Sequence, residues 1–486
     1  MTVDARRLDE EHETFRNELA SVHRDGRRKW IYARKPSGRY YRARTILSWF
    51  LLAFLFLAPF VKVQGQQLVL LDVIERRFVL LGLVFWPQDF HLVVLIVLTV
   101  LVTLVLSTAA VGRVWCGWLC PQTVFMEMLF RKIEWAIEGS AEQQLRRAKA
   151  PRSFDTLWRR GVKHAIFFGL AFVIANVFLA YIIGAEELWT IVTDPPSQHL
   201  AGLIAITIFS LVFYGVFARF REQACTLACP YGRLMSALID RHTITVTYDS
   251  RRGEPRGRLS RTQAAAATPR GDCVDCAQCV TVCPTGIDIR NGIQLECINC
   301  TACIDACDGV MDRLGRPRGL IRLTSHEIVR TGKGTWLTGR VKAYAAVWAL
   351  LLVTVTTLVA ARPDLDVLIL RQPGTLYAAV DEASVGNFYN VQIINRSSRS
   401  HELEYRAVAP EGARITPLGP IATAPPHQVV ESRLLLQVPR SRLQGAATPV
   451  RFEVWTAGEL LATIESSFLG PADEAARAGT SEGSRP

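Results

Sequence analysis

The residues of this chain best suited to chemistry are its twelve cysteines, eight of which fall into two copies of one pattern. The stretches "CVDCAQCVTVC" and "CINCTACIDAC" share the spacing C-x2-C-x2-C-x3-C. In two-cluster ferredoxins, three closely spaced thiolates hold one [4Fe–4S] cluster and the fourth cysteine reaches the other cluster. The pattern predicts two clusters, one held by Cys273, Cys276, Cys279 and Cys307 and the other by Cys297, Cys300, Cys303 and Cys283.

Zinc is the alternative metal for such cysteines, because paired C-x2-C units also form zinc sites. A zinc ion needs only four of the eight thiols, and the triple C-x2-C-x2-C is not typical of it. Cys307 is followed by Asp308 instead of the usual proline, but that proline turns the chain and is not a ligand. We therefore favour iron–sulfur clusters and a one-electron relay.

The other four cysteines form two C-x-x-x-C-P motifs, Cys116 with Cys120 and Cys225 with Cys229, each directly after an apolar run. The residue before proline avoids helical dihedrals, whereas proline suits the first turn of a helix. We expect each motif to end a membrane helix and to turn at Cys-Pro into a new helix. Soft thiolates select Cu(I), zinc or iron–sulfur centres. These four thiols are therefore candidate catalytic and metal ligands, in one site or two. Alternatively, they are inert buried cysteines.

Several nearby residues carry weaker signals. Residues 121–138 are expected to form a helix on the membrane surface, with charged Arg131 and Glu134 between its apolar positions. Trp115 and Trp118 are expected in the interfacial aromatic belt. A histidine lies at the outer end of each of two apolar segments. Such residues can bind quinone, haem or metal but more often face the interface; they are His91 and His199.

Five apolar segments are long enough to approach a membrane crossing: 46–63, 91–112, 162–184, 199–218 and 343–361. Lys and Arg number twelve in residues 1–45 and ten in 113–163, against two in 64–90 and none in 185–198. The positive-inside rule then places the N-terminus in the cytoplasm and, after five crossings, the C-terminus outside. The exported part, from residue 362 onward, has no cysteine, which fits thiols kept in a reducing compartment.

The net charge of +12 can indicate a nucleic-acid partner, but here the positive residues flank membrane segments. There they orient the chain and meet anionic lipid, so no nucleic-acid partner is expected.

From about residue 373, short alternating runs broken by Gly, Pro, Asn and Ser predict an antiparallel sandwich of the immunoglobulin type.

The predicted fold is a multi-domain membrane protein. It combines a five-helix transmembrane bundle, an inserted cytoplasmic bacterial-type 2[4Fe–4S] ferredoxin domain and a C-terminal immunoglobulin-like β-sandwich. The expected segments are a basic N-terminal segment (1–45), four helices with the duplicated motif (46–218), the ferredoxin-like domain (219–342), a fifth helix (343–361), the exported sandwich (373–469) and a disordered tail (470–486).

Taken together, these motifs resemble the CcoG family, also called FixG or RdxA, the cytochrome c oxidase accessory proteins of bacteria. The resemblance runs from about residue 28 to 469. It includes the PQD turn at 87–89, "CGWLCPQT", "CTLACPYGR", both ferredoxin motifs with "CIDACDGVMD", and the terminal sandwich.

The resemblance implies an inner-membrane protein that matures cbb3-type cytochrome c oxidase by reducing Cu(II) to Cu(I). Its partners would be that oxidase, its copper-delivery factors, copper ions as substrate or transient ligand, and membrane lipid. The electron donor, cytoplasmic or quinol, is not visible in the sequence. Two other functions stay open: a quinol-linked carrier similar to the NapH and NosR groups that supplies a periplasmic reductase, and a non-enzymatic scaffold for oxidase assembly.

Overall fold

The computed structural model describes residues 20–23, 25, 27–74, 76–151, 153–258, 270–419 and 423–471. Most of the predicted tail, residues 472–486, lies outside these ranges, as do residues 1–19 of the basic N-terminal segment. The chain forms two compact units, one built mainly from residues 86–357 and the other mainly from the strands after residue 358.

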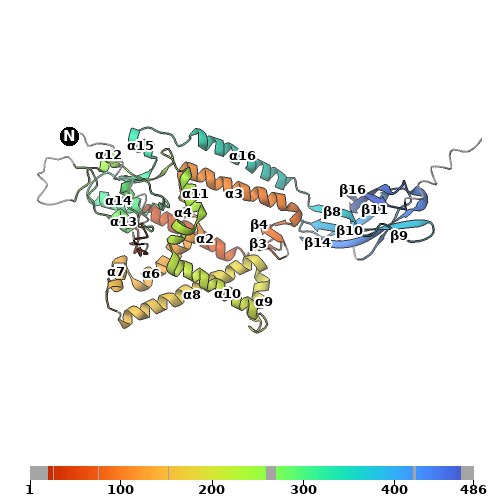
Figure 1. Ribbon diagram of the computed structural model, residues 1–486, viewed down its shortest axis with the longest axis horizontal. Coiled ribbons are helices and arrows are strands. Elements are labelled where there is room, and N and C mark those ends of the chain that lie inside the picture. The colour runs from red at the N-terminus through yellow and green to blue at the C-terminus, as the bar shows by residue number, and fades with distance from the viewer. Residues whose placement is uncertain are drawn as a thin grey trace, which may run out of the picture. The chain divides into compact units, whose positions relative to one another are not determined.

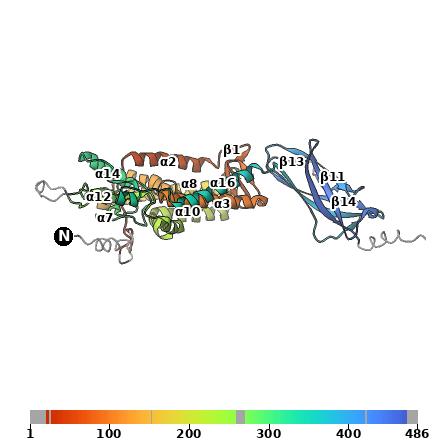
Figure 2. The ribbon, with the colours of Figure 1, turned by 90° about the horizontal axis from the view of Figure 1, so that it is seen from above.

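Within the described residues, four helices are long and apolar enough to cross a membrane: α3 (Phe90–Val111) with the 3-10 turn η2 (Pro87–Asp89) before it, α8 (Phe154–Ile183), α10 (Leu200–Gly215) with its continuation η4 (Val216–Phe220), and α16 (Gly339–Ala360). α10 packs against α8, and α16 lies beside α3 (Figures 1 and 2). The indole of Trp348 donates to the hydroxyl of Thr103 across the second pair at 2.9 Å. Most of their apolar surface is exposed, as expected where lipid is the solvent.

The first predicted membrane segment, 46–63, corresponds to α2 (Arg39–Leu57), which begins earlier and ends two residues before Pro59. α2 is not among the four helices that are long and apolar enough to cross a membrane. Its first residues, Tyr40 and Tyr41, donate their amides to Asp305. Near its other end, the carbonyl of Leu55 accepts from Tyr181, in the last turn of α8. α2 therefore runs along the length of the bundle.

The segment predicted to lie on the membrane surface is instead buried in the bundle. It is continuous through α5 (Pro121–Thr123), the π-helix η3 (Val124–Phe130) and α6 (Arg131–Glu138). Phe130 stacks on Phe217 at 4.8 Å between ring centroids, and Arg131 is only 1% exposed. The prediction was wrong because it placed the charged residues of this segment on a face exposed to water. Arg131 is instead buried and paired with Glu127 at 2.6 Å.

Shorter elements join the helices. The α2–α3 connection contains β1 (Lys62–Val63), β2 (Gln66–Gln67), β3 (Val69–Asp72), β4 (Arg77–Leu80) and β5 (Leu83–Phe85). Two further helices, α7 (Ala141–Lys149) and α9 (Ala185–Thr193), precede and follow α8. After α10 come η5 (Ala224–Ala228), α11 (Pro230–Leu234) and η6 (Met235–Leu238).

The cysteine-rich region is a small domain held by one two-stranded antiparallel sheet. β6 (Thr245–Tyr248) pairs with β7 (Ile321–Thr324), two strands separated by both cysteine motifs. Between them lie α12 (Ser250–Gly253), α13 (Gln278–Thr281), η8 (Ile289–Asn291) and α14 (Ala302–Arg313), and α15 (His326–Thr331) follows. The sheet closes the domain, so that both motifs face a shared apolar core.

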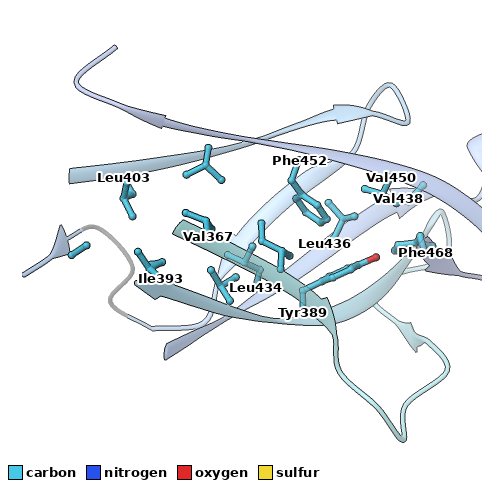
Figure 3. Packing of buried hydrophobic residues seen from close by; sticks show 14 of the residues in the cluster. Val367, Tyr389, Ile393, Leu403, Leu434, Leu436, Val438, Val450, Phe452 and Phe468 are labelled. Carbon is cyan, nitrogen blue, oxygen red and sulfur yellow. The ribbon is translucent and has the colours of Figure 1, made fainter. Parts of the chain in front are cut away.

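The C-terminal unit is a sandwich of two antiparallel sheets. One contains β8 (Leu365–Arg371), β9 (Ala378–Ala379), β10 (Ser384–Asn395), β12 (Arg414–Pro417) and β14 (Val429–Pro439). The other contains β11 (His401–Ala409), β13 (Thr423–Ala424), β15 (Ala447–Thr456) and β16 (Glu459–Leu469). Side chains from both sheets fill the core, where Tyr389 meets Phe452 edge-on at 5.1 Å (Figure 3). The first strand, β8, precedes the predicted domain boundary at residue 373.

Candidate iron–sulfur and thiol site

The first cavity in the cysteine-rich domain is lined by Cys273, Cys276, Cys279 and Cys307. Cys279 comes from α13 and Cys307 from α14, so both motifs contribute. Tyr248, Val310, Met311, Leu320 and Ile321 form apolar walls around the four sulfurs. Four thiols facing one enclosed space with apolar walls suit a cluster that is ligated only by cysteine.

The second cavity is lined by Cys283, Cys297, Cys300 and Cys303, with Cys279 also at its border. Burial raises the pKa of Cys297 to about 12 and that of Cys303 well above its ordinary value. These thiols are therefore protonated until a metal displaces the proton, so loading of the cavity should be coupled to proton release. The hydroxyl of Thr285 lies 3.3 Å from the sulfur of Cys283.

The two motifs fold their backbones in the same unusual way. Asp275 and Ala277 flank the middle cysteine of the first motif and have φ of 49° and 52°. Asn299 and Thr301 flank the middle cysteine of the second and have φ of 52° and 63°. Positive φ is uncommon for residues other than glycine. Its recurrence at matching positions indicates that the cysteine spacing imposes one loop conformation twice, around a common kind of ligand.

The second cysteine loop packs directly on the first C-x-x-x-C-P motif. A Cβ at Gly117 would meet the carbonyl oxygen of Ile298 and would lie 3.0 Å from the backbone nitrogen of Cys300. Beside it, the indole of Trp118 donates to the carbonyl of Asn299 at 3.2 Å. Trp118 thus contacts the cysteine loop.

Polar side chains fix this junction from both sides. The side-chain oxygen of Asn299 accepts from the amide of Val246 at 3.3 Å, and its nitrogen donates to the carbonyl of Val111 at the end of α3 at 3.2 Å. The guanidinium of Arg44 donates to the carbonyl of Gly117 at 2.6 Å. Both side chains are almost fully buried, so the membrane helices and the cysteine domain form one connected structure here.

Both C-x-x-x-C-P motifs turn as the sequence predicts. Cys120 and Cys229 are extended residues that precede helices α5 and α11, whose first residues are Pro121 and Pro230. The first cysteines differ in their surroundings: Cys116 lies in the short helix α4 (Val114–Trp118), and Cys225 lies in the π-helix η5.

The two motifs come close together. Burial, together with the charges of Cys120 and Cys116, raises the pKa of Cys225 to about 12. The pKa of Cys116 is raised by its own burial and, in smaller measure, by Cys120 and Cys229. Each motif therefore lies within electrostatic range of the other, and the four thiols occupy one region at the helix ends.

Arg113 connects this thiol region with the second cysteine loop. Its side chain is 3% exposed, hydrogen-bonds to Cys116 and donates to the carbonyl of Leu295. Its positive charge lowers the pKa of Cys116, Cys225 and Cys297 against the effect of burial. The sequence analysis missed Arg113 because a lone arginine before a cysteine motif has no distinctive spacing.

Among the described residues, no three His, Cys, Asp or Glu side chains are arranged around a point where they could hold a single metal ion. The cysteines of the two cavities are consistent with this, since a cubane needs its ligands farther apart than one ion does. The four membrane-edge thiols likewise do not form a ready mononuclear site.

The two histidines singled out in the sequence lie apart from these thiols in the chain. His199 pairs with Asp194 at 3.0 Å, and His91 is exposed at the start of α3.

Comparison with known proteins agrees with this architecture. Residues 220–326 match a family described as a 4Fe–4S dicluster domain, and residues 92–138 match a 4Fe–4S binding domain. Residues 355–471 match a family described as the IG-like fold at the C-terminus of FixG, putative oxidoreductase. The chain is thus an iron–sulfur protein with an immunoglobulin-like C-terminal domain.

Full-length relatives are found as well. Protein RdxA of Cereibacter sphaeroides is 34% identical over 90% of this chain and 97% of its own length. Nitrogen fixation protein FixG of Rhizobium meliloti is 35% identical over 76% of this chain and 77% of its own length. Protein RdxB of Cereibacter sphaeroides is 31% identical over 87% of this chain and 90% of its own length. A FixG-related protein from Vibrio parahaemolyticus, known from a crystal structure, covers 22% of this chain and 97% of its own at 17% identity, with a TM-score of 0.20. With identity above 30% over most of both chains, this protein belongs to the FixG/RdxA family.

Proposed function

We propose that the protein is a membrane electron carrier that reduces Cu(II) to Cu(I) at its membrane-edge thiols for assembly of a cbb3-type cytochrome c oxidase. The contact of Gly117 with the backbone of Cys300 is the main support, because it joins the thiol region to the second cysteine cavity. When bound, a [4Fe–4S] cluster supplies one electron at a time. Conversion of Cu(II) to Cu(I) consumes one electron, so the stoichiometry matches.

In this proposal the cysteines have separate roles. The first cluster is held by Cys273, Cys276, Cys279 and Cys307, and the second by Cys283, Cys297, Cys300 and Cys303. Copper is the substrate and binds Cys116, Cys120, Cys225 and Cys229, whose soft sulfurs favour the monovalent ion. Because the described residues hold no preformed mononuclear site, copper binds two of these thiols at a time or draws the four together.

The chain's own residues support the transfer in two ways. Gly117 and Trp118 keep the thiol region against the loop around Cys300, which shortens the electron path. Arg113 supplies a buried positive charge beside Cys116 and favours its thiolate form, the form that binds metal.

The same proposal places the protein in the bacterial inner membrane with five crossings. α2 is the first crossing, supported by contacts of its two ends with opposite ends of the bundle. The basic N-terminus and the cysteine domain then lie in the cytoplasm, and the sandwich lies in the periplasm. There the sandwich would dock the oxidase and its copper-delivery factors.

The test uses purified full-length protein, chemically reduced and freed of reductant without oxygen. Cu(II) is added, and Cu(I) is measured with a chromophoric chelator while cluster absorbance reports reoxidation. The wild type should yield about one Cu(I) per cluster. C116S/C120S and C225S/C229S should each lose most of this activity with unchanged iron content, whereas the neighbouring variant A228S should keep it.

Full Cu(II) reduction by both double variants would exclude the thiols as the copper site. Reduction of the clusters by quinol in membranes, with no copper reduction by the wild type, would instead favour the quinol-linked carrier.

A further inference from the structure

A cavity of about 390 Å³ lies apart from the cysteines, where α8 begins and α10 with its continuation η4 ends. The segment around Trp30 and Tyr32 and the helices α6 and α7 complete its walls. Five cationic side chains line it: Arg147, Arg159, Arg160, Lys163 and Arg219. So many positive groups around one hollow require an anionic occupant or internal counterions.

Internal counterions account for only part of this charge. The two acidic residues in the wall are engaged: Glu134 accepts from Arg221 at 3.0 Å, and Glu138 pairs with Lys163 at 2.9 Å. Arg159 is held by Asp155 at 2.9 Å. By contrast, the side chains of Arg160 and Arg219 make no hydrogen bond or ion pair with other residues that the structure describes. These two arginines are available to a ligand.

The cavity lies at the level where lipid headgroups meet water. The first turns of α8 expose Phe154, Leu157 and Trp158, at 84%, 54% and 65%, and the apolar exposure continues along the helix through Ile166 and Val173. A helix that exposes tryptophan among apolar side chains in its first turns is typical of one that crosses the headgroup interface there. The basic residues of the same turns must then lie among the headgroups.

The remaining walls fit a headgroup with polar and apolar parts. Gly215, which has no side chain, and Ala218 leave room on one side. On another, the hydroxyl of Tyr214 and the ring of His164 are hydrogen-bonded at 2.9 Å and supply polar groups. Basic pockets between membrane helices bind the headgroups of anionic lipids.

We propose that this cavity binds the phosphate of an anionic phospholipid from the leaflet on the side of the cysteine domain, through Arg160 and Arg219. The acyl chains would lie along the exposed face of α8. Arg221 and Arg28 both lie over the ring of Trp30, and Arg28 pairs with Glu222. A bound lipid would therefore brace the segment that leads from α10 to Cys225. This proposal does not depend on copper reduction.

The experiment titrates detergent-purified full-length protein with short-chain phosphatidylglycerol and counts bound molecules by native mass spectrometry. One lipid should bind the wild type, and short-chain phosphatidylcholine should bind far less. R160Q/R219Q should weaken phosphatidylglycerol binding by about 10- to 30-fold. R160K/R219K, which keeps the charges, should retain most of the affinity, and iron content should be equal in all samples.

The matched control is R146Q/K149Q, which removes two exposed cations from α7 that do not line the cavity. Equal binding by R160Q/R219Q and the wild type, or an equal loss in R146Q/K149Q, would overturn the proposal. Inorganic phosphate that binds as tightly as the lipid and depends on the same arginines would support the phosphate chemistry and exclude the lipid as its source.

Discussion

Gly117 has no side chain, and the backbone of residues 298–300 occupies the space that one would take. Close backbone approach is one of the few reasons for which a helix tolerates glycine. Here it sets the separation between the thiol region and the second cysteine cavity. Asn299 and Arg44 then hold the junction with buried hydrogen bonds.

Replacing Gly117 with valine should therefore damage the junction. The added methyl groups overlap backbone atoms that cannot rotate away, and overpacking of this kind costs roughly 1–3 kcal/mol. We expect a lower temperature for loss of cluster absorbance and a slower Cu(II) reduction. Gly309, exposed on α14 with no atom near its missing Cβ, offers the control variant G309A. Equal behaviour of G117V and G309A would show that the close contact does not matter.

Thr285 should tune the second cluster through its hydroxyl, 3.3 Å from the sulfur of Cys283. A hydrogen bond to a ligating sulfur stabilises the more negative, reduced state. T285V removes the hydroxyl with little change in shape, so the reduction potential should fall by some tens of millivolts. A redox titration followed by EPR measures the shift. An unchanged potential, or an equal fall at both clusters, would contradict the assignment of Cys283 to the second cavity.

At the scale of elements, the segment 121–138 is held by ion pairs that have no access to water. Arg131 lies against Glu127 at 2.6 Å, and both are buried. Removal of one partner of such a pair leaves an uncompensated charge, which typically costs 3–5 kcal/mol, whereas replacing both can be nearly neutral.

We therefore expect R131M to destabilise the protein strongly and E127L/R131M to recover much of the loss. Thermal unfolding in detergent, followed by tryptophan fluorescence, measures both. The comparison variant is R451M, which breaks an exposed pair with Glu465 on the sandwich and should change stability by less than about 1 kcal/mol. If the double variant is no more stable than R131M, the burial of an isolated charge is not the cause.

The longer strands of the sandwich were largely predictable because one face is more buried than the other. The run 429–439 coincides with β14, and 401–408 falls within β11. Alternation in the sequence could not reveal β8, because Leu368 and Leu370 are apolar although they lie on its exposed face. Nor could periodicity show that the segment 121–138 is buried on both faces, because Arg131 and Glu134 look like solvent-facing residues until their partners are known.

Cysteine spacing predicted more of the site than any other feature. It assigned each motif's fourth cysteine to the opposite cluster, and each of these cysteines lines a cavity with three cysteines of the other motif, with Cys279 also at the border of the second cavity. Cysteine spacing could not predict the roles of Arg113, Asn299 and Arg44, because these roles depend on contacts between residues far apart in the chain. Their types and spacing carry no signal by themselves.

For the whole molecule, the five-crossing arrangement predicts where each end of the chain lies. Alkaline phosphatase, which is active only outside the cytoplasm, should be active when fused after residue 471 and inactive after residue 258. In this arrangement α2 is the first crossing and the N-terminus is cytoplasmic, so a green fluorescent protein fused there should fluoresce. Active phosphatase at both the N-terminus and residue 471 would mean four crossings, with α2 outside the membrane.

The exchange of Cys283 and Cys307 between the two cavities also constrains biosynthesis. During translation the first loop emerges about two dozen residues before the second, yet the first cavity lacks Cys307 until α14 has been made. The second cavity likewise needs Cys283 from the earlier loop. A nascent chain that stops before residue 307 lacks one of the four thiols of the first cavity, so that cavity can be filled only after α14 has been made.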